Sequence, residues 1–201
     1  MRHGEVHNPA HVLYGRLPNF ALSPAGRRMA REAADYVQRL SRPVAALIAS
    51  PLQRTRESAE PFTEAFGIEP TLDERVIEPT NVFEGKRMGA AMADPRNWRY
   101  LSQPAVPGWG EPYVHVVARM REAMADAWQA VPSGDVVIVS HQLPIWVTHL
   151  AVAGRPLRHD PRRRRCGLSS ITSFEGGPDA WREVSYVEPA FTAGALDVGA
   201  V

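Results

Sequence analysis

Two short apolar runs constrain the fold of this chain more than any other feature. They are Val44–Ala49 and residues 136–140, the second of which ends at Ser140. A strand with one solvent-exposed face alternates apolar and polar residues, and neither run does so. Each run has the length of a strand. Such runs are typical of parallel strands that are covered on both faces. We therefore predict an α/β fold, a three-layer α/β/α sandwich with a mostly parallel central sheet.

Helical patterns surround these two runs. Ser23 and Pro24 have the residue types of a helix N-cap and a first helical position, and apolar residues follow at helical spacing. Trp128 is expected on the apolar face of a later helix. The remaining expected elements are helices at 52–65, at 113–130 and from about 144, with strands at 168–174 and 181–187.

The length of 201 residues fits a single domain. We place this domain at residues 1–187, with a small cap insert near residues 79–110 and a flexible tail at 188–201. The insert carries several aromatic residues, which either line the far end of a substrate or simply pack the insert onto the domain.

The charge balance excludes several classes of partner. With 23 Lys and Arg residues against 22 Asp and Glu, the formal net charge is +1. The chain therefore has no overall attraction for nucleic acid or an anionic membrane, and we expect neither as a partner. The four-arginine run at 162–165 is interpreted as a solvated loop.

Cys166 is the only cysteine, which excludes an intrachain disulfide and a Cys-based zinc cluster and fits a reducing compartment. No apolar run approaches the ~20 residues needed to span a bilayer. We expect a cytoplasmic protein, and a homodimer stays possible.

Chemically useful side chains follow the predicted strands. Arg54 comes shortly after the first apolar run, and His141 comes directly after the second. Open parallel sheets bind their ligands at the carboxyl ends of the strands, so we interpret both side chains as ligand-binding. Arg2 and His3 begin the chain. If His3 and His141 lie side by side, one could attack a phosphorus atom while the other binds its oxygens, which would be a phosphoryl-transfer site.

The first histidines have the spacing of a metal site on a helix but not the context of one. His3, His7 and His11 are spaced as they would be on one face of a helix, but Pro9 and the polar context argue against a helix there. We predict no metal and no cofactor.

Five stretches occur in the order found in one known family. The chain resembles the histidine phosphatase superfamily, the phosphoglycerate mutase-like proteins, from Arg2 to about Phe174. The matching stretches are Arg2-His3-Gly4, Ser50-Pro51-Leu52-Gln53-Arg54, Ile77-Glu78 through Phe83-Glu84-Gly85, Gly110-Glu111-Pro112, and Val139-Ser140-His141.

The resemblance implies a mechanism without a metal. His3 would form a phosphohistidine, and Arg2, Arg54 and His141 would bind the phosphoryl oxygens. Glu78 or Glu84 would be the general acid and base, and we favour Glu78.

Three further residues are candidate substrate contacts. Asn8 matches an asparagine that hydrogen-bonds phosphate in relatives, although it also reads as a turn residue. Arg16 is either a substrate contact or a solvated side chain. Gln142 stands where the family commonly has glycine, and it could contact the substrate or narrow the pocket mouth.

The start of the chain departs from the family. In relatives a short apolar strand in the middle of the sheet precedes Arg-His-Gly, whereas only Met1 precedes Arg2 here. We therefore expect an apparently truncated first strand, and we favour a shortened start over a sheet that closes without this strand. The expected function is hydrolysis of a small phosphomonoester. A mutase and a catalytically weak phospho-ligand-binding module are the alternatives.

Overall fold

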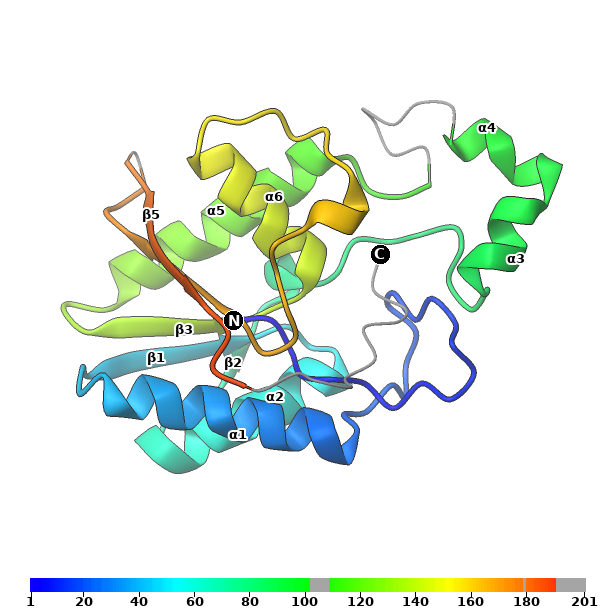
Figure 1. Cartoon of the computed structure of the whole chain (residues 1–201). Coiled ribbons are helices and arrows are strands. Elements are labelled where there is room, and N and C mark those ends of the chain that lie inside the picture. The colour runs from blue at the N-terminus through cyan, green and yellow to red at the C-terminus, as the bar shows by residue number, and fades with distance from the viewer. Residues whose placement is uncertain (102–108, 179, 191–201) are drawn as a thin grey trace.

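The computed structural model describes residues 1–101, 109–178 and 180–190, and it confirms the predicted α/β class. β1 (Val44–Ala49) lies in a parallel sheet between β2 (Thr71–Leu72) and β3 (Asp135–Val139). β4 (Ile171–Glu175) and β5 (Arg182–Val187) form a separate antiparallel pair. Figure 1 shows the antiparallel pair beside β3.

Helices cover both faces of the parallel sheet (Figure 1). α1 (Pro24–Arg39) and α2 (Gln53–Phe66) lie on one face, and α5 (Tyr113–Ala130) and α6 (Gln142–Val152) lie on the other. Within β1, Leu47 and Ala49 belong to the core beneath α1 and α2, while Ile48 packs against the core beneath α5. Two buried faces explain why this strand is apolar throughout, and they make the predicted three layers.

α1 and α2 begin and end close to the residues that the sequence predicts. The Ser23 hydroxyl accepts a hydrogen bond from the Gly26 N–H at 3.0 Å, and Pro24 is the first helical residue. α2 ends at Gly67, whose φ of 69° is left-handed. The prediction for Trp128 is wrong, because its side chain is 49% exposed. It lies near the end of α5 against the turn at Gly177, outside the core.

The first three residues lie between β3 and the β4–β5 pair. Arg2 pairs in parallel with Ser140, and the Arg2 N–H donates to the Ser170 carbonyl at 3.0 Å. The α-amino group of Met1 donates to the Ile138 carbonyl at 2.7 Å. Residues 1–3 thus lie where the truncated first strand was expected, and an isolated parallel bridge at Arg2 joins them to Ser140.

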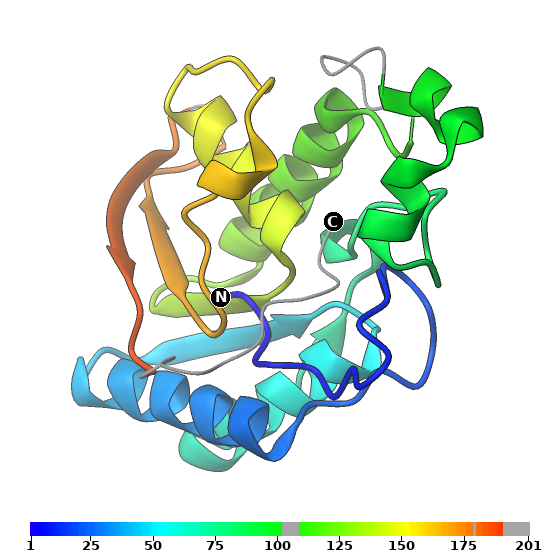
Figure 2. The same ribbon diagram turned by 45° about the vertical axis from the view of Figure 1, so that its right-hand side comes forward.

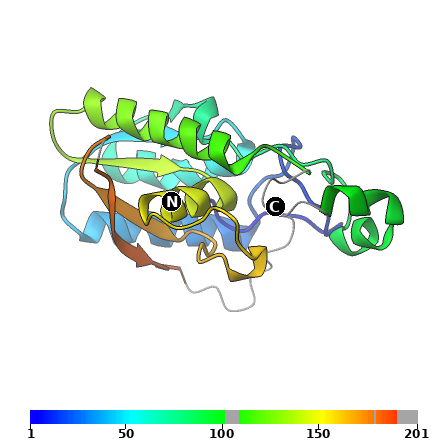
Figure 3. The ribbon, with the colours of Figure 1, turned by 90° about the horizontal axis from the view of Figure 1, so that it is seen from above.

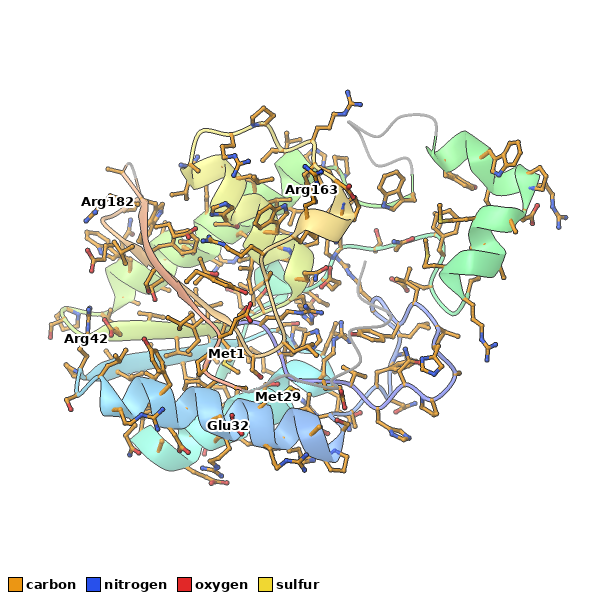
Figure 4. The ribbon with its side chains drawn as sticks, viewed as in Figure 1. Met1, Met29, Glu32, Arg42, Arg163 and Arg182 are labelled. Carbon is orange, nitrogen blue, oxygen red and sulfur yellow. The ribbon has the colours of Figure 1, made fainter. Side chains whose placement is uncertain are left out.

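A groove of about 580 Å³ continues behind Met1. Its walls come from β3 and β4, including Val137 and Ile171, and from the flanking helices. Figure 2 shows the β4–β5 pair standing apart from β3, and Figure 4 places Met1 near the centre of the molecule and Arg42 towards its edge. Both residues line the groove.

β4 starts later than predicted. The sequence favoured a strand at 168–174, but the chain turns first, with the Ser170 N–H donating to the Gly167 carbonyl at 3.1 Å. Ser169 has a φ of 54°, which a strand does not allow. The strand therefore begins only at Ile171.

The described part of the predicted insert, residues 79–101 and 109–110, contains short helices beyond the carboxyl ends of the strands. α3 (Met88–Ala93) and α4 (Trp98–Leu101) lie at one end of the molecule, away from the sheet (Figure 3). Tyr100 and Trp109 pack with Leu13, Phe83 and Ala91, so these two aromatic side chains attach the segment to the loop near Leu13. Residues 102–108 of the predicted insert and 191–201 of the predicted tail lie outside the described residues.

No helix in the described part of the chain is long and apolar enough to cross a membrane.

Candidate active site

Three chain segments bring the candidate residues to one edge of the sheet. His3 follows Arg2, which forms an isolated parallel bridge with Ser140, Arg54 lies in the first turn of α2 after β1, and His141 lies just beyond β3. The side chains of all three are almost completely buried, with 1% or less of each residue exposed. The carboxyl ends of neighbouring parallel strands meet at this edge, as the sequence predicted.

The two histidines lie side by side. Their ring centroids are 5.3 Å apart and the ring planes are inclined by 62°. His3 Nδ1 lies 2.8 Å from the Gly4 carbonyl oxygen, which can only accept a hydrogen bond, so Nδ1 carries the proton. The lone pair of His3 is therefore on Nε2. Burial, and next the charges of Arg54 and Arg2, hold the pKa of His3 well below its ordinary value, which keeps the ring neutral.

Gly4 fixes the backbone beside His3. A Cβ atom at Gly4 would lie 2.3 Å from the Gly26 carbonyl oxygen, so the chain packs directly onto the first turn of α1. The Gly4 N–H donates to the Ser58 hydroxyl of α2 at 3.1 Å. These contacts hold His3 on both sides, and they give a physical reason for glycine in Arg-His-Gly.

His141 is surrounded by polar partners. Its Nε2 lies 2.8 Å from the Ser50 hydroxyl, and its Nδ1 lies 3.2 Å from Arg54 Nη2. Glu78 Oε2 is 3.6 Å from the same Nδ1. Burial, followed by the charges of Arg54 and of His3, lowers the pKa of His141 well below its ordinary value. The ring is therefore neutral and can donate one hydrogen bond.

Two buried arginines and two helix N-termini place positive charge around the histidines. Arg2 Nη1 donates to the Cys166 carbonyl at 2.7 Å. Arg54 Nη2 donates to the Gly15 carbonyl at 2.8 Å, and its guanidinium lies 4.7 Å from the centre of the Tyr14 ring. α2 and α6 also begin at this edge, and the N-terminal end of a helix attracts anions. The arrangement suits a phosphoryl group.

The structure separates the two candidate carboxylates. Glu78 is 1% exposed and faces His141, and its Oε1 has no hydrogen-bond partner among the described residues. Burial raises the pKa of Glu78, an effect that Arg54 and more weakly Arg164 oppose. Glu84 instead accepts hydrogen bonds from the backbone N–H groups of Arg16 and Asn81, at 3.0 and 3.2 Å. Glu84 thus anchors a loop, whereas Glu78 lies among the histidines.

With this geometry established, one comparison decides the family. The profile of the histidine phosphatase superfamily, branch 1, matches residues 1–189. The chain belongs to the histidine phosphatase superfamily. The predicted resemblance is thereby confirmed.

Individual relatives indicate which class of reaction this member of the superfamily catalyses. It is 46% identical to the Uncharacterized protein Rv0525 of Mycobacterium tuberculosis strain H37Rv, over 94% of this chain and 95% of the relative. It is 30% identical to the Probable phosphoglycerate mutase GpmB of Erwinia tasmaniensis, over 85% and 82% of the two chains. The structure is also similar to the mycobacterial glucosyl-3-phosphoglycerate phosphatase Rv2419c, with a TM-score of 0.76 and 26% identity, over 90% of this chain and 93% of that one. Membership and neighbours indicate phosphatase or mutase activity.

The three candidate substrate contacts of this histidine phosphatase differ in placement. The Asn8 amide bonds to the backbone of Val12, donating to its carbonyl at 2.8 Å, so Asn8 shapes a turn as well as lying buried. Arg16 Nε donates to the Glu78 carbonyl, and its Nη2 lies 3.5 Å from Glu111 Oε2. Gln142 follows His141 at the start of α6. Their roles in substrate binding stay predictions.

The interpretation of the basic run as a solvated loop is wrong for one of its members. Arg164 is partly buried, and its Nη1 donates to Gln142 Oε1 at 3.2 Å. The sequence showed four adjacent arginines but gave no sign that the loop folds back onto α6.

Ser50 and Tyr14 were also not predicted as site residues. Ser50 contacts His141, and Tyr14 lies under Arg54 with its ring 6.3 Å from that of His3. The position of Ser50 at the end of β1 was the available signal. The first residues form no helix across His3, His7 and His11, as Pro9 indicated.

Proposed function

We propose that the protein hydrolyses small phosphomonoesters through a phosphohistidine on His3. The observation that carries this proposal is the pairing of a neutral, buried His3, whose Nε2 lone pair is available, with a buried Glu78 whose pKa is raised. A nucleophile and an acid held in these forms are what hydrolysis of a phosphate ester needs near neutral pH.

In the first step His3 Nε2 attacks the phosphorus atom and forms the P–N bond. The P–O bond to the leaving group breaks, and Glu78 gives its proton to the departing oxygen. Arg2, Arg54 and the Nε2–H of His141, which exchanges the Ser50 hydroxyl for the substrate, stabilise the negative charge on the three equatorial oxygens. Because all of these groups are buried, their interactions with the phosphoryl group are weakly screened.

In the second step the Glu78 carboxylate takes a proton from a water molecule. The resulting hydroxide-like oxygen attacks the phosphorus, the P–N bond breaks, and the electron pair returns to His3 Nε2. Inorganic phosphate leaves, with Glu78 protonated again and the enzyme in its starting form.

A mutase is the second candidate, because one relative is named a probable phosphoglycerate mutase. The phosphohistidine would then pass its phosphoryl group to a second hydroxyl instead of to water. Assaying 3-phosphoglycerate for both free phosphate and the 2-phospho isomer distinguishes the two reactions.

The proposal is tested with p-nitrophenyl phosphate and a rapid acid-free quench. The protein should release phosphate and, after brief reaction with ³²P-labelled substrate, carry an acid-labile, base-stable label on His3. The His3→Ala variant should show neither turnover nor label. Turnover retained in that variant would exclude the covalent route.

A further inference from the structure

Tyr14 contacts both the nucleophile and a phosphate-binding arginine, although it lies in a loop. Only 3% of the residue is exposed. The Arg54 guanidinium lies 4.7 Å from the centre of the Tyr14 ring, and the His3 ring meets it edge-on with centroids 6.3 Å apart. The Phe20 ring packs 5.3 Å away, and the Tyr14 carbonyl accepts a hydrogen bond from the Leu17 N–H at 2.7 Å. The ring is therefore fixed both by its loop and by an aromatic neighbour.

The next residue in the loop holds the same arginine. The Gly15 carbonyl accepts a hydrogen bond from Arg54 Nη2 at 2.8 Å. Gly15 has a φ of 40°, and a Cβ atom there would lie 2.2 Å from Glu84 Oε1, so glycine lets the loop pass close to Glu84. Glu84 accepts a hydrogen bond from the Arg16 N–H at 3.0 Å. Residues 14–16 thus contact the guanidinium through an anchored ring and an anchored carbonyl.

An aromatic ring stabilises a guanidinium differently from a carboxylate. The ring attracts the cation through the face of the guanidinium, which leaves the N–H groups in its plane available. A carboxylate would occupy these same N–H groups, often two at once. Arg54 Nε has no hydrogen-bond partner among the described residues. The contact with Tyr14 therefore holds the cation while keeping a donor for the phosphoryl oxygens.

Glu78 is a competing partner for this arginine. Both side chains approach the same atom, His141 Nδ1, at 3.2 Å for Arg54 Nη2 and at 3.6 Å for Glu78 Oε2. Within the described chain, Glu78 Oε1 also has no hydrogen-bond partner. A guanidinium that moved towards Glu78 would form an ion pair, which favours the charged carboxylate and removes the proton that the leaving group needs.

We propose that Tyr14 is a positioning residue that holds the Arg54 guanidinium towards the phosphoryl group and away from an ion pair with Glu78. Tyr14 acts through Arg54 and touches no reacting atom. The expected effect on turnover rests on the proposed function. The expected effect on phosphate binding requires only that Arg54 binds phosphate.

Two substitutions of Tyr14 test the proposal with inorganic phosphate as the ligand. Tyr14→Leu removes the ring, so the phosphate affinity should fall with the fraction of molecules that keep Arg54 in place. The calorimetric Kd should rise roughly ten- to thirtyfold, the size of a desolvated cation–π contact. Tyr14→Phe keeps the ring and should retain most of the affinity. Tyr14→Met is a second variant without a ring, for use where leucine prevents folding.

Tyr36→Leu is the matched control. Tyr36 is a partly buried tyrosine of α1 that packs against the core, and this variant should bind phosphate as the wild-type protein does. Thermal unfolding of every variant measures the accompanying loss of stability. A Tyr14→Phe variant that loses as much phosphate affinity as Tyr14→Leu would overturn the proposal.

An Arg54→Ala background separates positioning of the arginine from a general loosening of the pocket. Tyr14→Leu should weaken phosphate binding no further in this background, because no guanidinium is left to hold. An equal loss with and without Arg54 would mean that Tyr14 acts through His3 or through packing alone, and it would refute the proposal.

The pH dependence of kcat with glycerol 3-phosphate reports on the competition for Glu78. The charged and titratable groups around Glu78 are Arg2, Arg54, Arg119, Arg164 and His141. In Tyr14→Leu, pairing with Arg54 would lower the pKa of Glu78, so the fall of kcat at high pH should begin at a lower pH than in the wild-type protein. Tyr14→Phe should keep the wild-type profile. An unshifted profile in Tyr14→Leu would contradict the role of the ring in keeping Arg54 from Glu78.

Phosphate binding also separates this proposal from the proposed function. A protein that hydrolyses no ester, yet loses phosphate affinity in Tyr14→Leu and keeps it in Tyr14→Phe, would refute the phosphatase and support the positioning role. Hydrolysis through a phosphohistidine, with equal phosphate affinity in the wild-type protein and Tyr14→Leu, would do the reverse.

Discussion

Five β-branched apolar residues joined to the amino end of Met1 are expected to enter the groove between β3 and β4. Arg2 already pairs with Ser140, so a strand continued in this register would lie alongside Ile138 and the residues before it. The groove of about 580 Å³ is lined largely by apolar side chains, including Phe174 of β4. We predict that this extension raises both the melting temperature and the phosphatase activity.

Part of the gain comes from removing a buried charge. Burial lowers the pKa of the Met1 α-amino group from 8.0 to about 6. A pKa that is lowered by two units on folding means that protonation of the amine reduces the free energy of unfolding by ~2.7 kcal/mol. The unfolded chain binds this proton more tightly, so the penalty is absent above pH 8, grows as the pH falls from 8 to 6, and is complete below pH 6. An extension converts the amine to an amide and removes the penalty.

The rest of the gain comes from filling the groove. Each buried Val or Ile contributes ~1.5–3 kcal/mol, of which ordering the backbone offsets ~1–2 kcal/mol, leaving roughly 2–4 kcal/mol for five residues. In a chain of this length 1 kcal/mol changes the melting temperature by ~2–4 °C, so the apolar extension should add about 5–15 °C. A more firmly held His3 should also react faster, because displacing a nucleophile by ~1 Å can reduce a rate a hundredfold.

A Gly-Ser extension of equal length separates the two contributions. This extension removes the amine without filling the groove. It should therefore raise the melting temperature at pH 6, where the amine is charged, and change it little at pH 8.5. Thermal unfolding of the three proteins at both pH values measures each part. Equal stability and activity of the unextended and apolar-extended proteins at both pH values would refute the reasoning and show that the sheet closes without another strand.

Five further predictions concern the site and the backbone beside it. His141→Ala should slow turnover by ~10²–10³, since it removes one donor to the transition state, while His3→Ala abolishes it. Glu78→Gln should slow formation of the phosphohistidine from glycerol 3-phosphate by ~10²–10⁴ but affect its formation from p-nitrophenyl phosphate much less, because p-nitrophenolate leaves without a proton, while hydrolysis of the phosphohistidine should slow for both esters. The pKa of His3 is lowered, so kcat with glycerol 3-phosphate should persist below pH 6.5. The pKa of Glu78 is raised, so kcat should fall at higher pH, as Glu78 loses its proton. Glu78→Gln should remove this fall at high pH. Gly26→Ala should destabilise the protein by ~1–3 kcal/mol in urea unfolding, because its Cβ would lie 2.0 Å from the Glu5 carbonyl, whereas Gly89→Ala, with nothing within 4 Å, should not. A chelator should leave the rate of the wild-type protein unchanged, and lost activity that Zn²⁺ or Mg²⁺ restores would contradict the metal-free mechanism.

The parts of the fold that the sequence predicted are those with a local cause. β1 and β3 are apolar on both faces because helices cover both, and that burial is visible as an unbroken run. Ser23 and Gly67 mark helix ends through the chemistry of their own positions. Trp128 and the start of β4 were missed because each depends on a turn that packs from elsewhere in the chain.

The same distinction between local and tertiary causes applies to the residues of the candidate site. Arg54 and His141 were placed from sequence because the end of a parallel strand is a local position with a known geometry. Arg164 was missed because its contact with Gln142 joins two segments that are 22 residues apart, and no pattern within either segment indicates it.

Glu78 and Glu84 show why burial, rather than residue type, assigns a catalytic role. Both are glutamates of the same motif, and the spacing alone left the choice between them open. Glu84 remains partly exposed and accepts hydrogen bonds from the backbone N–H groups of Arg16 and Asn81. Glu78 is buried, so desolvation raises its pKa, which suits the proton-donor role proposed for it, while Arg54 and the other nearby arginines oppose this rise, which suits the proposed second step. The packing that makes this residue suitable as an acid is thus tertiary, and it is the same packing that brings it within 3.6 Å of His141.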